Sequence, residues 1–86
     1  MPREVPSEEL DAAVRELDRV RDSWLRRPGV VGVDVGFRLV DDRLTDQLAI
    51  RVHVRAGHDP GPLPDALGAF PVTVVRAAYA PEEEEL

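Results

Sequence analysis

Cysteine and lysine are absent from this chain, and aromatic residues are few. The 86 residues contain one tryptophan, one tyrosine and two phenylalanines. Without cysteine there is no disulfide framework and no thiolate zinc site, which is typical of an intracellular protein, so we expect a cytoplasmic location. Serine is also scarce, because Ser7 and Ser23 are the two that occur, and neither lies in a Gly-x-Ser-x-Gly nucleophile motif. The sequence therefore predicts a protein that is not an enzyme.

Long apolar runs and basic clusters are missing as well. No segment approaches the ~20 apolar residues that span a bilayer, and no basic patch interleaved with aromatic residues indicates a nucleic-acid ligand. We therefore expect neither a membrane nor a nucleic acid as partner. The net charge of −6 comes mainly from the four glutamates at positions 82–85, because residues 1–81 carry 11 positive and 13 negative side chains.

The length allows one domain. We expect residues 1–6 to be a flexible arm, residues 7–79 a single domain and residues 80–86 a disordered acidic tail, because adjacent like charges repel. A helix is predicted from Ser7, as its N-cap, to about Arg26, with Pro28-Gly29 ending it. Its apolar residues recur at spacings of three and four, which is typical of one buried stripe. They are Leu10, Ala13, Val14, Leu17, Val20 and Trp24.

Two long strands follow, at residues 30–40 and 47–55, with a connecting loop between them. In both strands apolar and polar residues alternate, which assigns them to opposite faces of a sheet. Because a slip of one residue would invert every side chain, matching the apolar faces leaves three registers open. They place Asp34 opposite Arg51, His53 or Arg55.

A third strand is predicted from Val72 to Ala78, after a Pro- and Gly-rich loop at 56–70 with one helical turn near 64–67. This strand either runs parallel beside the first strand or forms a meander beside the second. The fold class is therefore α+β, with one N-terminal amphipathic helix packed on a three-stranded sheet. Three strands and one helix leave one face of the sheet uncovered, and short sheets also have exposed edges.

The segments Gly32–Phe37, Thr45–Val54, Leu63-Pro64 and Pro71–Val75 carry a resemblance to a known family. Together they resemble the small domain that precedes the protease domain in bacterial trypsin-like serine proteases and in related plant serine proteases. There, the first strand reads Gly-Val-Gly-Val-Gly-aromatic, whereas this chain has Asp34 in place of the middle glycine. These 86 residues contain nothing that resembles the protease domain. The resemblance therefore implies an accessory domain and no catalytic activity.

One strand face gathers glycines and charged side chains and is the candidate site for a protein partner. Its residues are Gly32, Asp34, Gly36, Arg38, Arg51, His53 and Arg55. The glycines leave shallow steps that another backbone or helix can approach, and the charges can set its register. His53 also makes a pH-sensitive contact conceivable, because histidine titrates near neutrality. The simpler interpretation is a solvated sheet face with ordinary cross-strand pairs.

Other ligand sites are disfavoured. His53, His58 and Asp59 fall short of a metal-ligand set, because two histidines and one carboxylate lie partly on a loop. The glycines at 29, 32 and 36 lie within a strand rather than between a strand and a helix, so they do not form a dinucleotide-binding motif. We expect no metal and no cofactor.

The function that these observations favour is a non-catalytic protein-interaction module, acting as an adaptor or regulator. Its partner is another protein or a second copy of the chain, bound through the open sheet face or an edge. The alternative, by analogy with the resembling family, is an inhibitor or folding assistant of a separate trypsin-like protease.

Overall fold

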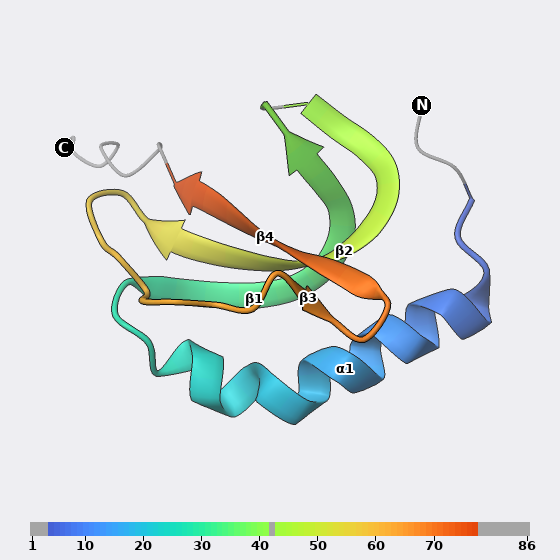
Figure 1. The fold of residues 1–86 in the computed structure, drawn as a ribbon, viewed down its shortest axis with the longest axis horizontal. Coiled ribbons are helices and arrows are strands. Elements are labelled where there is room, and N and C mark those ends of the chain that lie inside the picture. The colour runs from blue at the N-terminus through green and yellow to red at the C-terminus, as the bar shows by residue number, and fades with distance from the viewer. Residues whose placement is uncertain (1–3, 42, 78–86) are drawn as a thin grey trace, which may run out of the picture.

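The computed structural model describes residues 4–41 and 43–77 (Figure 1). Within them the chain forms one helix and four strands: α1 (Ser7–Leu25), β1 (Val30–Val40), β2 (Arg43–Arg55), β3 (Ala66–Leu67) and β4 (Phe70–Ala77). This confirms the α+β class, with one strand more than predicted. The start of the predicted arm (1–3), the end of the predicted domain (78–79) and the predicted tail (80–86) lie outside the described residues.

The helix α1 begins one residue earlier than its predicted cap implies. Pro6 is the N-cap, and its carbonyl accepts hydrogen bonds from the N–H groups of Glu9 and Leu10, both at 3.1 Å. The prediction that Ser7 caps the helix is therefore wrong, because Ser7 is already helical. Proline is tolerated here because the N-cap has a non-helical backbone and needs no N–H of its own for the helix. At the other end Gly29 redirects the chain with a φ of 76°.

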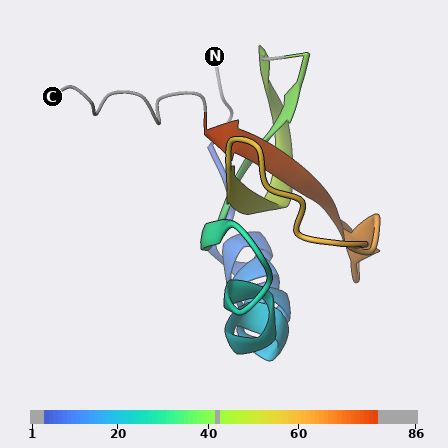
Figure 2. The ribbon, with the colours of Figure 1, turned by 90° about the vertical axis from the view of Figure 1, so that its left-hand side faces the viewer.

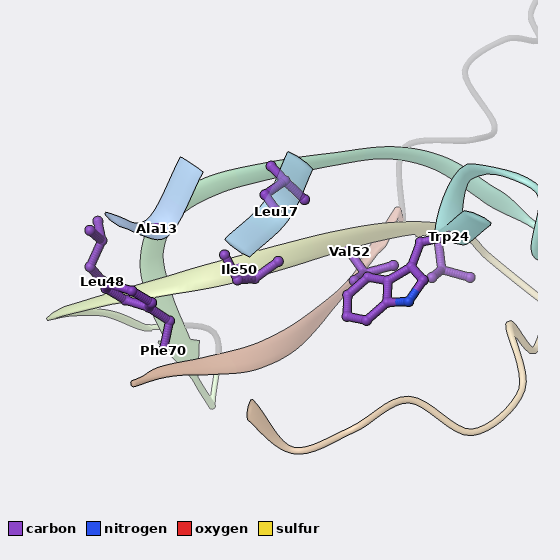
Figure 3. Packing of buried hydrophobic residues seen from close by; sticks show 8 residues of the cluster. Ala13, Leu17, Trp24, Leu48, Ile50, Val52 and Phe70 are labelled. Carbon is purple, nitrogen blue, oxygen red and sulfur yellow. The ribbon is translucent and has the colours of Figure 1, made fainter. Parts of the chain in front are cut away.

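Helix α1 lies along one face of the sheet, under β1 and β2 (Figure 2). The core joins buried side chains of α1, alternate residues of β2 and the first residue of β4. They are Ala13, Leu17, Trp24, Leu48, Ile50, Val52, Val54 and Phe70 (Figure 3). Trp24 is 4% exposed, which confirms the prediction that it belongs to the core.

Two members of the predicted helical stripe stay outside this core. Leu10 is 42% exposed and Val14 is 36% exposed. The reason is the position of α1, which packs mainly on β1, at one end of the sheet. The flank of the helix that carries Leu10 and Val14 therefore has no strand beneath it.

β1 and β2 form an antiparallel hairpin with Asp34 opposite Arg51. This is one of the three registers that the alternation left open. β2 starts at Arg43, earlier than the predicted position 47, because Val40 already pairs with Arg43 across a tight turn. Asp41 enters that turn with a φ of 51°, as two-residue hairpin turns require.

β4 lies beside β2 and runs parallel to it, so the strand order is β1-β2-β4-β3. Each predicted arrangement is right in one respect only: the first gave the parallel direction but the neighbour β1, and the second gave the neighbour β2 but the antiparallel direction of a meander. The segment 56–65 crosses back along the sheet before β4 begins, which allows the parallel pairing. The helical turn predicted at 64–67 is also wrong: Ala66 and Leu67 form β3 and pair antiparallel with Pro71 and Phe70.

The crossover segment 56–65 runs on the same side of the sheet as α1. Arg27, just after the helix, donates from Nη1 to the carbonyls of Pro60 at 3.0 Å and Pro62 at 2.8 Å. Leu63 packs against the core from this side. The helix and the crossover thus share one face of the sheet.

Neither the helix nor the crossover segment of the described residues covers the opposite face of the sheet (Figure 2). The far end of the β1–β2 hairpin bends away from α1 (Figure 1). There, Leu39 and Asp41 line a shallow hollow together with Val74 and Val75 of β4. None of the described helices is long and apolar enough to cross a membrane.

Candidate functional site

The uncovered side of the sheet carries all seven residues of the predicted partner site and is called the polar face below. β1 contributes Gly32, Asp34, Gly36 and Arg38, and β2 contributes Arg51, His53 and Arg55. The register pairs Gly32 with His53 and Asp34 with Arg51, so even-numbered residues of β1 and odd-numbered residues of β2 share this side. On the other side, Val33 and Val35 of β1 pack against the core residues Leu48, Ile50, Val52 and Val54 of β2, whereas Val31 is 47% exposed.

Asp34 is the centre of a side-chain cluster on the polar face. Its Oδ1 accepts a hydrogen bond from Nε of Arg51 at 2.9 Å, and its Oδ2 accepts one from Nη2 at 3.1 Å. Nε2 of His53 lies 3.1 Å from Oδ2. The Arg51 fork matches the carboxylate in a bidentate pair, which fixes the orientation of both groups. The cluster is half-buried, since the Asp34 side chain is 45% exposed and that of Arg51 25%.

This arrangement changes the acidity of Asp34. Partial burial by itself raises the pKa of Asp34, but the hydrogen bonds and the charges of Arg51, followed by those of His53, outweigh it. The pKa of Asp34 therefore lies below its ordinary value of 3.8. The hydrogen bond to Asp34 likewise raises the pKa of Arg51 against the opposing effect of burial. Asp34 and Arg51 are therefore an ion pair throughout the physiological range.

The two glycines beside Asp34 have different environments. A Cβ at Gly36 would lie 2.6 Å from Nε and 2.8 Å from Nη2 of Arg51, so the guanidinium rests over this glycine. A Cβ at Gly32 would meet no heavy atom within 4 Å. The predicted shallow step therefore exists at Gly32, whereas at Gly36 the Arg51 side chain fills it.

Arg38 and Arg55 lie away from the Asp34 cluster. Nη1 of Arg38 donates to the amide oxygen Oε1 of Gln47 at 3.3 Å, so its contact is with a neutral group. Its carbonyl accepts a hydrogen bond from the hydroxyl of Thr45 at 2.9 Å. Arg55 is exposed at the end of β2. The structure thus brings together Asp34, Arg51, His53 and Gly36 and leaves the other predicted residues around them.

Residues of β4 join the polar face, which the sequence analysis missed. The parallel pairing places Thr73 opposite Arg51 and Val75 opposite His53. Strand alternation separates Thr73 and Val75 from Val72 and Val74, but it cannot tell which strand lies beside them. Ala49 also lies on this side and is 0% exposed, which shows that the polar face is recessed beside Gly36.

The histidines and Asp59 considered for a metal site do not converge. His58 packs on Gly29 at the helix side of the sheet, where a Cβ at Gly29 would overlap its side chain. Oδ1 of Asp59 accepts a hydrogen bond from the N–H of Gly61 at 2.9 Å, which closes the loop locally. Across residues 4–41 and 43–77 no group of three or more His, Cys, Asp or Glu side chains is placed to hold a metal ion.

No protein-family model, curated protein or solved structure matches this chain.

Proposed function

We propose that this chain is a non-catalytic protein-interaction module that binds its partner on the polar face. The observation that carries the proposal is the Asp34–Arg51–His53 cluster, which is ordered by three short contacts and yet lies on an uncovered side of the sheet. A pre-ordered polar surface loses little conformational entropy when a partner docks, which favours affinity. The open step at Gly32 allows a partner backbone to approach closely.

The charges of the polar face favour an acidic partner segment. Among the seven residues of the site, Arg38, Arg51 and Arg55 stand against a single carboxylate, that of Asp34. Asp34 neutralises Arg51, whereas among residues 4–41 and 43–77 neither Arg38 nor Arg55 is in an ion pair. Their charges are therefore the ones offered to a partner. Complementary charge of this kind steers association and sets the register of the docked segment.

The test is affinity capture from an extract of the source cells, with the retained proteins identified by mass spectrometry. Gly32→Leu adds bulk at the open step, and Arg51→Ala dismantles the cluster. Asp22→Leu and Arg19→Ala are matched controls, because they make the same kinds of change on the exposed side of α1. We expect the parent and both controls to retain the same protein, and both polar-face variants to lose it.

Equal retention by all five chains would overturn the proposal and make the polar face an ordinary solvated surface. Raising the salt concentration is expected to weaken a genuine capture, because exposed charges are screened. Retention of a trypsin-like protease on the parent chain would specify the function as protease regulation.

A further inference from the structure

Among the described residues, β1 has a free edge on the side away from β2. β1 is an end strand of the sheet, with β2 as its one strand neighbour, and it is 11 residues long. Natural sheets protect such edges with proline, lysine, short strands or a covering element. Register shifts interrupt β1 between Val30 and Gly32 and between Phe37 and Leu39. The regular stretch between them contains neither proline nor lysine, whereas the opposite end of the sheet is the two-residue strand β3. The long edge of β1 is thus the one suited to strand pairing.

The sequence of β1 is complementary to itself. When two β1 strands pair antiparallel, the polar side chains of both copies lie on one face and the apolar ones on the other only under one condition. The two-fold axis must pass through a residue and not between two residues. An axis at Asp34 would place two carboxylates opposite each other, which is unfavourable. An axis at Gly36 places Asp34 of each copy opposite Arg38 of the other, and Val35 opposite Phe37. That register makes two reciprocal ion pairs and keeps both faces continuous.

The side chains needed for these ion pairs are available. Asp34 is 45% exposed, and its three contacts leave one of about four lone-pair positions for another donor. Arg38 contacts the neutral oxygen of Gln47 and has no carboxylate within ion-pair distance among the described residues. A carboxylate from a second copy would therefore give Arg38 a charged partner that the described part of its own chain does not provide.

Exposed apolar residues of α1 lie beside the same free edge of β1. Helical geometry turns each residue by about 100°, so Leu10, Val14 and Leu25 lie on the flank opposite to Glu16 and Arg19. Glu16 and Arg19 line a hollow with β3, so Leu10, Val14 and Leu25 point past the free edge of β1. These three are 42%, 36% and 41% exposed. A two-fold axis through paired β1 strands would bring the same flank of a second copy against them.

We propose that two copies of this chain form a symmetric dimer, with antiparallel β1 strands joined about Gly36 and the apolar flanks of α1 facing each other. The inference rests on the proposed function as an interaction module and names a second copy as the partner of the β1 edge. Because the dimer is isologous, every contact away from the two-fold axis occurs twice.

The assembly is tested by sedimentation equilibrium of the full chain over a wide range of protein concentration. We expect a monomer–dimer equilibrium in the parent. Arg38→Asp sets like charges opposite each other at both ends of the register and is expected to raise the dissociation constant by about tenfold or more. Val14→Glu is expected to do the same through the helix flank, whereas Arg19→Ala, on the flank of α1 that faces β3, leaves the equilibrium unchanged.

The register is tested by disulfide formation, since the parent chain has no cysteine. The proposed pairing places Gly32 of one copy opposite Val40 of the other. Positions 32 and 40 are about 26 Å apart along one strand. In a dimer of a single variant the two identical cysteines are therefore too far apart to form a disulfide. A mixture of Gly32→Cys and Val40→Cys chains is expected to cross-link, and a mixture of Gly32→Cys and Arg38→Cys chains is not. Cross-linking of the second mixture would overturn the register.

A parent chain that stays monomeric at all concentrations would overturn the dimer. Circular dichroism shows whether each variant is still folded, so that loss of the dimer is distinguished from loss of the fold. The capture experiment separates the two proposals: a monomer whose polar face still retains a partner contradicts only the dimer. A dimer whose polar-face variants retain the same proteins as the parent contradicts only the partner site.

Discussion

The guanidinium of Arg51 rests directly over Gly36, where any Cβ would be within 2.8 Å of its Nη2. The missing side chain at Gly36 therefore gives Arg51 the space to lie flat on the sheet and reach Asp34 with a bidentate pair. Glycine usually weakens a strand, and here that cost is offset by an ordered ion pair. The two glycines of the polar face thus have different roles, because Gly32 has no such neighbour.

Substitution of these two glycines by leucine is expected to separate the two roles. Gly36→Leu must displace the Arg51 guanidinium and should cost about 1–2 kcal/mol of unfolding free energy, since it removes the ion pair and crowds the face. Gly32→Leu enters open space and should change the unfolding free energy by no more than about 0.5 kcal/mol. Urea denaturation of both variants measures the difference. Equal losses of unfolding free energy would contradict the packing of the Arg51 guanidinium over Gly36.

Asp34 is expected to contribute to the acid sensitivity of the fold. Its pKa is lower in the folded chain than the ordinary 3.8, so folding favours the ionised carboxylate. The resulting stabilisation is complete above roughly pH 5 and is lost as the pH falls through the lowered folded-state pKa. Asp34→Asn should therefore be less stable than the parent near neutrality, and the gap should narrow below pH 4. Denaturation curves at several pH values test this, and a constant gap would contradict it.

Trp24 is expected to be the largest single contributor from the helix. Its side chain is buried in the core with Leu17 and Val52. Trp24→Ala should lower the unfolding free energy by about 3–5 kcal/mol, because it removes a large buried aromatic group and leaves a cavity. Chemical denaturation provides the measurement, with Leu44→Ala, at a position that is 57% exposed, as the control. A loss below 1 kcal/mol would show that the helix packs in another way.

Arg27 is expected to hold the crossover segment in place. Its two hydrogen bonds to the Pro60 and Pro62 carbonyls join the end of α1 to this segment. Arg27→Ala should cost about 1–2 kcal/mol, in the range for hydrogen bonds that involve a charged group. Hydrogen exchange of residues 56–65 should accelerate in this variant and not in Arg26→Ala. Unchanged exchange in Arg27→Ala would show that the proline-rich segment is held by its own stiffness.

The helix and the two faces of the hairpin were determined by the sequence alone. The spacing of Ala13, Leu17 and Trp24 predicts the buried stripe because a helix repeats every 3.6 residues regardless of what it packs against. Period-two alternation likewise assigns Asp34 and Arg51 to one face and Ile50 and Val52 to the other. Local geometry imposes these patterns, so they can be read before any tertiary contact is known.

Tertiary structure decided which of these residues meet. The choice of Arg51 opposite Asp34 depends on the tight turn at Asp41 and on the register shift between Phe37 and Leu39. No local propensity specifies either feature. The parallel position of β4 depends on the crossover, which Arg27 holds on the helix side. That crossover leaves the polar face open and puts Thr73 and Val75 on it. Long-range packing made these choices, because several registers and strand orders satisfy the same alternation equally well.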